Sequence, residues 1–165
     1  MNTLMLLLGL AAVVDEWQWK QAVEVAPDGI TELEAGLGPS LATAKIRTIK
    51  LEKGAQAGGE RNRGFHCSGG RNPCSPVLEV ELEVDDKKVR VPASVFADLA
   101  DVNRAELRQT GDTVTLVLAC GDAAGSYSVR IEFDAVQVRK RQLIGAFGTH
   151  EVAEETTYHE LTSLD

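Results

Sequence analysis

The chain is poor in the residues from which most catalytic and metal sites are built. Its 165 residues include only three histidines and three cysteines, and aromatic residues make up 5% of the total. A cysteine nucleophile needs a nearby base, but all three histidines fall in segments without a strand or helix pattern. Tetrahedral zinc sites usually draw on closely spaced ligand pairs, and none is present. The sequence therefore predicts no catalytic residue, no metal and no cofactor.

Basic residues are also scarce relative to acidic ones. The chain has 17 lysines and arginines against 25 aspartates and glutamates, which gives a formal net charge of −8. A nucleic-acid binder needs a dense basic face, and the overall field of this chain repels polyanions. We therefore expect no nucleic-acid partner. The hydrophobic content of 44% and the charged content of 25% are ordinary for a globular protein, which excludes disordered and fibrous classes.

No apolar run reaches the roughly 20 residues that a membrane-spanning helix needs. Residues 4–14 form one uncharged run that stops at Asp15, and its length suits the apolar centre of a secretory signal. We expect residues 1–14 to be a signal-like segment and residues 15–165 to form a single β-rich domain of a periplasmic or secreted protein. The alternative is that this run belongs to the fold and that the protein is cytoplasmic.

The chain is rich in the alternation of apolar and polar residues that is typical of half-buried strands. The segments 113–120 and 126–133 are two such runs, and pairing Cys120 with Tyr127 places Leu116 opposite Ile131 and gathers all their apolar side chains on one face. A turn at Gly111 and Asp112 sets the preceding run against them in the same way, with Leu107 opposite Leu116.

Further strand patterns lie on both sides of this region. They cover residues 17–25, 30–33, 45–51, 78–84, 89–91, 104–110 and 136–141, with an edge strand near 156–158 in an acidic tail, 149–165. A turn at Asp86 and Lys87 would pair Val84 with Val89, and Lys140 falls on the apolar parity of its strand. Residues 95–99 predict one short helix. We expect an all-β, mainly antiparallel fold with one short helix, either a meander barrel or a two-layer β-sandwich.

One long irregular segment, Gly54 to Pro76, interrupts the strands. Loops of this length in compact domains are commonly functional, and arginine is enriched at protein-binding hot spots. Its candidate binding residues are Arg61, Arg63, His66 and Arg71. Cys67 and Cys74 lie in the same loop and could close a disulfide in an oxidising compartment, whereas Cys120 lies on an apolar strand face.

Three functions are compatible with these patterns. The leading hypothesis is an exported, non-enzymatic domain that binds another protein through the loop or an exposed sheet edge, in an inhibitor or immunity-like role. The first alternative is a barrel that carries a small apolar ligand, lined by Trp17 and Trp19, although core packing is the commoner role for such residues. The second is a hydrolase that uses Cys67 or the paired carboxylates Glu79 and Glu81, although a solvated acidic stripe is the stronger explanation of these glutamates.

Overall fold

The computed structural model describes residues 19–51, 74–110, 113–121, 126–145 and 151–159. Within them the chain forms strands and a single short 3-10 helix, η2 (Ala93–Val95). The four-stranded sheet contains β2 (Gly29–Leu37), β3 (Ser40–Thr48), β4 (Val77–Val84) and β5 (Lys87–Lys88). The six-stranded sheet contains β1 (Val23–Glu24), β6 (Val102–Thr110), β7 (Thr113–Cys120), β8 (Tyr127–Phe133), β9 (Val138–Gly145) and β10 (Val152–Thr157).

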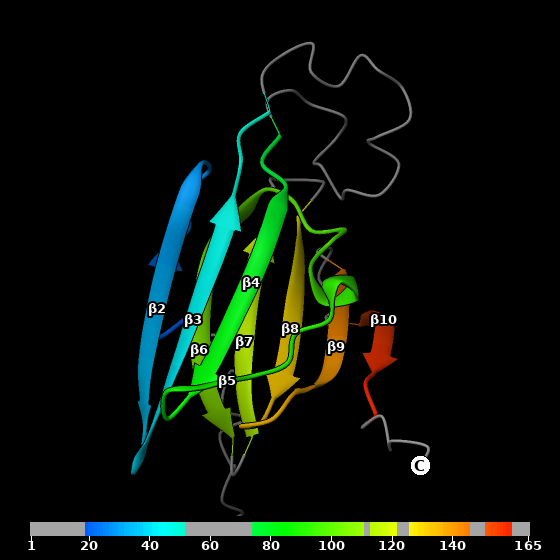
Figure 1. Ribbon diagram of the computed structural model, residues 1–165. Coiled ribbons are helices and arrows are strands. Elements are labelled where there is room, and N and C mark those ends of the chain that lie inside the picture. Colours follow the sequence, from blue (N-terminus) through cyan, green and yellow to red (C-terminus); the bar gives the residue numbers. More distant parts are fainter. Residues whose placement is uncertain (1–18, 52–73, 111–112, 122–125, 146–150, 160–165) are drawn as a thin grey trace, which may run out of the picture.

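The two sheets lie face to face as a two-layer sandwich (Figure 1). Their strand orders are β2-β3-β4-β5 and β1-β6-β7-β8-β9-β10, and all strand pairs within them are antiparallel. The chain passes from the six-stranded to the four-stranded sheet after β1, and it returns after β5 through η2. No strand of one sheet joins the ladder of the other among the described residues, so the closed barrel does not form and the sandwich alternative is the observed fold.

The register of the central strands is the predicted one. Cys120 pairs with Tyr127 and Leu116 with Ile131 across β7 and β8, and Leu107 pairs with Leu116 across β6 and β7. A slip by one residue would turn the apolar side chains of β7 and β8 toward solvent, which is why the pattern determines this pairing so strongly.

The β4–β5 hairpin differs from the prediction. Its turn consists of Asp85 and Asp86, which adopt φ angles of 50° and 62°, so Val84 pairs with Lys87 and not with Val89. Two consecutive positive φ angles are the geometry of a type I′ turn, which aspartate tolerates better than most residues. Asp85 also accepts hydrogen bonds from the Leu41 backbone N–H (2.9 Å) and from the Ser40 hydroxyl (3.0 Å), and these bonds lower its pKa.

A β-bulge corrects the predicted parity of β9. The β8–β9 register shifts between Glu132 and Phe133, so Lys140 pairs with Glu132 on the solvent side. Arg141 then lies opposite Ile131 and points inward, where only 2% of it is exposed. The bulge inserts a residue that no alternation in the sequence announces.

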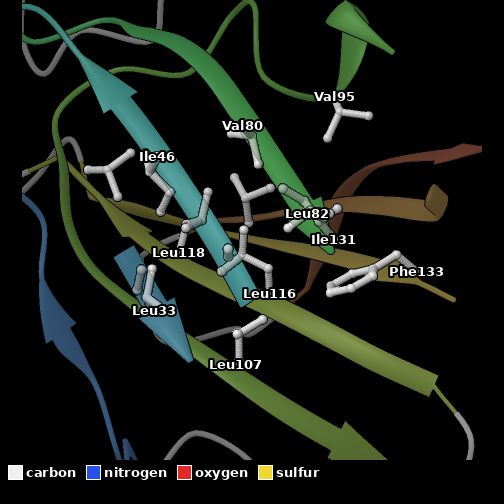
Figure 2. Close-up of a cluster of buried hydrophobic side chains, with 14 of the residues drawn as sticks. Leu33, Ile46, Val80, Leu82, Val95, Leu107, Leu116, Leu118, Ile131 and Phe133 are labelled. Atoms are coloured by element: carbon white, nitrogen blue, oxygen red, sulfur yellow. The ribbon is translucent and has the colours of Figure 1, made fainter. Parts of the chain in front are cut away.

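The core lies between the two sheets (Figure 2). Leu33, Ile46 and Leu82 extend from the four-stranded sheet toward Leu116 and Ile131 of the six-stranded sheet. The predicted helix shortens to η2, but Val95 and Leu99 still reach this core and are fully buried. The apolar side chains between the sheets form one packed cluster.

Candidate binding site

The predicted loop residues Arg61, Arg63, His66 and Arg71 lie outside the described residues, as does Cys67. The end of that loop is part of the core. Cys74 is fully buried, its carbonyl accepts the Leu51 N–H at 2.9 Å, and the Ser75 N–H donates to Asp101 Oδ1 at 2.8 Å. Cys74 is not among the free cysteines. The Cys67–Cys74 disulfide stays a prediction.

Trp19 lies at the outer side of β6. The Arg108 guanidinium lies over its ring at 5.4 Å, and Trp17 is outside the described residues. Beside them the buried Glu106 carboxylate accepts the N–H groups of Lys20 (3.1 Å) and Gln21 (3.2 Å) and pairs with Arg108 (2.8 Å). Burial would raise the pKa of Glu106, but these donors together lower it. The group anchors the segment that leads into β1.

Glu79 and Glu81 lie on the outer face of the four-stranded sheet, each opposite a cation on β3. Arg47 pairs with Glu79, Nη2 to Oε2, at 2.6 Å, and Lys45 is the cross-strand neighbour of Glu81. Lys45 Nζ also contacts Glu32 Oε1 on β2 at 3.1 Å, and this bond raises the pKa of Lys45. An exposed row of alternating charges resembles a solvated sheet face more than a pair of catalytic acids.

The strand β2 is an edge of the four-stranded sheet, and no other described strand pairs with its outer side. A two-residue turn at Gly38 and Pro39 closes the β2–β3 hairpin at the pair Leu37 and Ser40. In such a hairpin the closing pair and every second pair after it exchange backbone hydrogen bonds. The intervening residues turn their N–H and C=O groups away from β3; they are Ile30, Glu32, Glu34 and Gly36.

A cleft opens on the opposite side of the sandwich, between the segment that follows β5 and the adjoining ends of β9 and β10. Its volume is about 470 Å³. It is lined by Arg90, Pro92, Gln137, Val138, Thr157, Tyr158 and His159. We call it the Arg90–Gln137 cleft.

The backbone of the two sheets meets at this cleft in an isolated parallel bridge. The Arg90 N–H donates to the Val136 carbonyl at 2.8 Å, and the Val138 N–H donates to the Arg90 carbonyl at 3.1 Å. Gln137 sits between these contacts with 2% of its surface exposed. Its side-chain oxygen accepts a hydrogen bond from Arg90 Nη2. Its amide nitrogen is buried and has no acceptor among the described residues.

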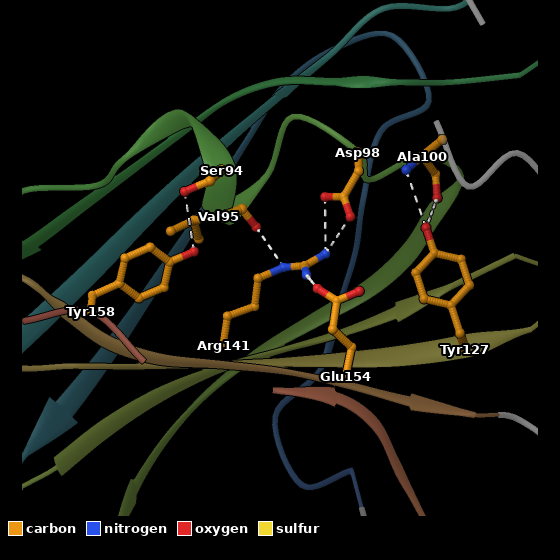
Figure 3. A network of polar contacts seen from close by, with 8 residues as sticks. All are labelled: Ser94, Val95, Asp98, Ala100, Tyr127, Arg141, Glu154 and Tyr158. Atoms are coloured by element: carbon orange, nitrogen blue, oxygen red, sulfur yellow. Dashed lines mark hydrogen bonds and ion pairs between the residues drawn. The ribbon is translucent and has the colours of Figure 1, made fainter. Parts of the chain in front are cut away.

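A buried arginine holds the neighbouring wall in place (Figure 3). Arg141 Nε donates to the Val95 carbonyl at 3.1 Å, Nη2 contacts Asp98 at 2.7 Å, and Nη1 contacts Glu154 at 2.8 Å. One side chain of β9 thereby joins the η2 segment to β10. The Tyr158 hydroxyl lies 3.4 Å from the Ser94 hydroxyl, which closes the same wall beside the cleft.

Cys120 and Tyr127 form a second buried polar pair that faces the core. Burial raises the pKa of the Cys120 thiol to about 12 and also raises the pKa of the Tyr127 hydroxyl. The Tyr127 hydroxyl donates to the Ala100 carbonyl at 3.1 Å and accepts the Ala100 N–H at 3.2 Å. A thiol with so high a pKa is protonated at neutral pH and is a poor nucleophile.

The described part of the chain contains no cluster of three or more histidine, cysteine, aspartate and glutamate side chains that could hold a metal. It also contains no helix long and apolar enough to cross a membrane. The residues of the Arg90–Gln137 cleft were not predicted as a site. In the sequence Gln137 occupies the polar position between Val136 and Val138, so no residue pattern indicates that Gln137 is buried.

In comparisons with known proteins, the chain matches no protein-family model, no curated protein and no solved structure.

Proposed function

We propose that this protein is a non-enzymatic binding domain that captures a partner protein by accepting a strand along the open edge of β2. The observation that carries the proposal is the outward row of N–H and C=O groups at Ile30, Glu32, Glu34 and Gly36. An edge strand with such a row is a template for pairing with another chain. At nine residues β2 is as long as any described strand, whereas the opposite edge, β5, has only two residues.

The charges on the outer face favour a basic partner strand. Passing from β4 to β2, one row across the sheet reads Glu81, Lys45 and Glu32, so the sign alternates from strand to strand. The next position beyond Glu32 therefore favours a cation, because opposite charges on directly opposed residues stabilise a strand pair.

The same charges disfavour a second copy of this chain as the partner. Antiparallel pairing of two β2 strands would bring Glu32 and Glu34 of one copy beside those of the other. Like charges at opposed positions destabilise a sheet, so these glutamates select against self-association at this edge.

Two parts of the sequence hypothesis remain within this proposal. The loop 54–76 is a second candidate contact surface, and its deletion has to spare the buried residues from Cys74 onward. The apolar run at residues 4–14 supports export to the periplasm or the medium. An inhibitor or immunity-like role is one form that binding of a partner protein would take. Mass spectrometry of the protein from its own host tests export by reporting the mature N-terminus and the redox state of Cys67 and Cys74.

A defined peptide tests the edge directly. We expect a short peptide that alternates lysine and valine to protect the backbone amides of Ile30, Glu32, Glu34 and Gly36 from hydrogen exchange, and a peptide that alternates glutamate and valine to leave them unprotected. Glu32→Pro removes an outward N–H without removing a β2–β3 hydrogen bond, so it blocks pairing in a chain that still folds.

Charge reversal supplies the matched control. Glu32→Lys is expected to weaken binding of the basic peptide by about tenfold, the size of a lost charge-assisted contact. Glu151→Lys changes the net charge equally but lies beside β10, and we expect no effect from it. Protection that maps to another surface, or binding that is insensitive to Glu32→Pro, would contradict the edge assignment.

The alternative function, binding of a small ligand, is better supported at the surface than between the sheets. The described apolar side chains between the sheets belong to one packed cluster, which gives no support to a ligand carried there. A ligand function instead points to the Arg90–Gln137 cleft.

A further inference from the structure

We propose that the Arg90–Gln137 cleft binds a carboxylate attached to an apolar body, such as a medium-chain or aryl-substituted acid. This site lies on other strands than the β2 edge and is independent of it. Three observations carry the proposal: the orientation of the Gln137 amide, the charge of Arg90, and the apolar walls.

The orientation of the Gln137 amide follows from its partner. A guanidinium has donors only, so the atom that faces Arg90 Nη2 must be the oxygen of Gln137 and the other atom must be the nitrogen. That nitrogen is buried, and no described residue accepts its N–H groups. Most buried polar groups have a partner, and an exception calls for one supplied from outside the chain. Gln137 lines the cleft, so an acceptor placed there can meet this need.

The electrostatics of the cleft select an anion. Arg90 forms no ion pair with a described carboxylate, and its guanidinium hydrogen bond goes to a neutral amide. The nearby carboxylate of Asp134 is turned away: it accepts the N–H groups of Val136 and Gln137 and pairs with Arg139. Asp134 therefore does not neutralise Arg90. The residues that line the cleft include no aspartate and no glutamate.

The shape and composition of the cleft favour a carboxylate over a phosphate. A single guanidinium and one amide can donate to the oxygens of one carboxylate, whereas a dianionic phosphate is usually held by several cations or by a helix N-terminus. Pro92, Val138 and the ring of Tyr158 supply apolar surface beside these donors. The volume of about 470 Å³ lies in the range of small-molecule sites and exceeds what a bare carboxylate fills.

Octanoate is the first probe, with octanol and octylamine as matched neutral and cationic probes. Titration into the labelled protein, followed by amide chemical shifts, is expected to move Arg90, Gln137, Val138 and Tyr158 with octanoate. We expect octanol to bind at least about tenfold more weakly, because it cannot form the charge-assisted pair with Arg90. Equal affinity for octanoate and octanol would overturn the proposal.

Two substitutions separate ligand binding from a purely structural role. Gln137→Glu keeps the shape of the side chain and gives Arg90 an ion-pair partner, so the fold is retained while the new carboxylate repels octanoate and abolishes its binding. Arg90→Gln removes the charge from an exposed side chain and is expected to lower the affinity for octanoate by about tenfold. The controls Gln109→Glu and Arg104→Gln make the same chemical changes on exposed positions of β6 and should leave the affinity unchanged. Retention of octanoate binding by Gln137→Glu would refute the site.

A final pair of probes asks whether the carboxylate can belong to a peptide end. An acetylated peptide that ends in leucine is compared with its C-terminal amide. Preference for the free acid would place peptide ends among the ligands, and binding of octanoate alone would restrict the site to small acids. If neither octanoate nor the peptide acid shifts the cleft resonances, the proposal is wrong.

Discussion

Replacing Arg141 by methionine removes a side chain that bonds to both the η2 segment and β10 (Figure 3). The guanidinium is 2% exposed, and its loss leaves the Val95 carbonyl and the Asp98 carboxylate without the donor they now share. Methionine fills similar space with apolar atoms, so the experiment isolates the polar contacts from the volume.

The magnitude follows from the exposure of the partners. Breaking a fully buried ion pair costs about 3 to 5 kcal/mol. Here the side chains of Asp98 and Glu154 are 30% and 54% exposed, so both acceptors can regain water once the arginine is gone. We therefore expect a loss of about 2 to 3 kcal/mol in the free energy of unfolding, which corresponds to a fall in Tm of about 4 to 12 °C for a domain of this size.

Urea denaturation measures this loss, with Arg104→Met on the exposed side of β6 as the matched control. The control should change stability by no more than about 0.5 kcal/mol. Hydrogen exchange is expected to show that Arg141→Met opens β10 and η2 before the central strands. A change as small as that of the control, or uniform opening of the whole sandwich, would refute the role assigned to Arg141.

Further predictions concern the core, a turn and two titratable groups. Leu116→Ala should lower the free energy of unfolding by about 3 to 5 kcal/mol in the same denaturation assay, because the side chain is fully buried. Asp86→Gly should raise it by about 0.5 kcal/mol, since glycine adopts the φ of 62° without strain. The pKa of Glu106 is lowered in the folded state. The ionised carboxylate therefore stabilises the fold at pH values above its ordinary pKa of 4.5, and this stabilisation is lost as the pH falls through the pKa of the folded state. Glu106→Gln should therefore flatten the acid limb of a pH–stability profile. Cys120 should resist a thiol reagent until the protein unfolds, because burial raises its pKa to about 12; rapid labelling of the native protein would contradict this.

The sequence determined the pairing of β7 with β8 because two constraints coincide there. Both runs alternate strictly, and the few residues between Cys120 and Tyr127 leave one register that buries Leu116 and Ile131 together. In the β4–β5 hairpin the apolar pattern that pairs Val84 with Val89 indicated a wrong register. The positive φ angles of Asp85 and Asp86 decided it, and aspartate is compatible with either turn.

The binding surfaces were harder to predict, since they depend on contacts between distant segments. Arg90 and Gln137 are far apart in the sequence and meet only through a bridge between the two sheets. Arg141 faces inward because Arg139 forms a bulge in β9 that no residue type marks. The sequence predicted that an exposed sheet edge exists, because every sandwich has edges. It did not predict that β2 forms this edge, because that depends on the order of strands in the sheet.

The order of strands along the chain also bears on how the molecule is made. The four-stranded sheet comes entirely from residues 29–88, and β6 to β10 come from residues 102–157, so the sandwich is two successive meanders. A chain on the ribosome completes the first meander while Leu33, Ile46 and Leu82 still lack the layer that covers them in the finished protein. The strand β1 precedes both meanders but pairs with β6. It therefore cannot pair until β6 has been synthesised. Synthesis therefore passes through a half-built sandwich with one apolar face open to water, and a translation pause before β6 would lengthen the time in which that face can aggregate.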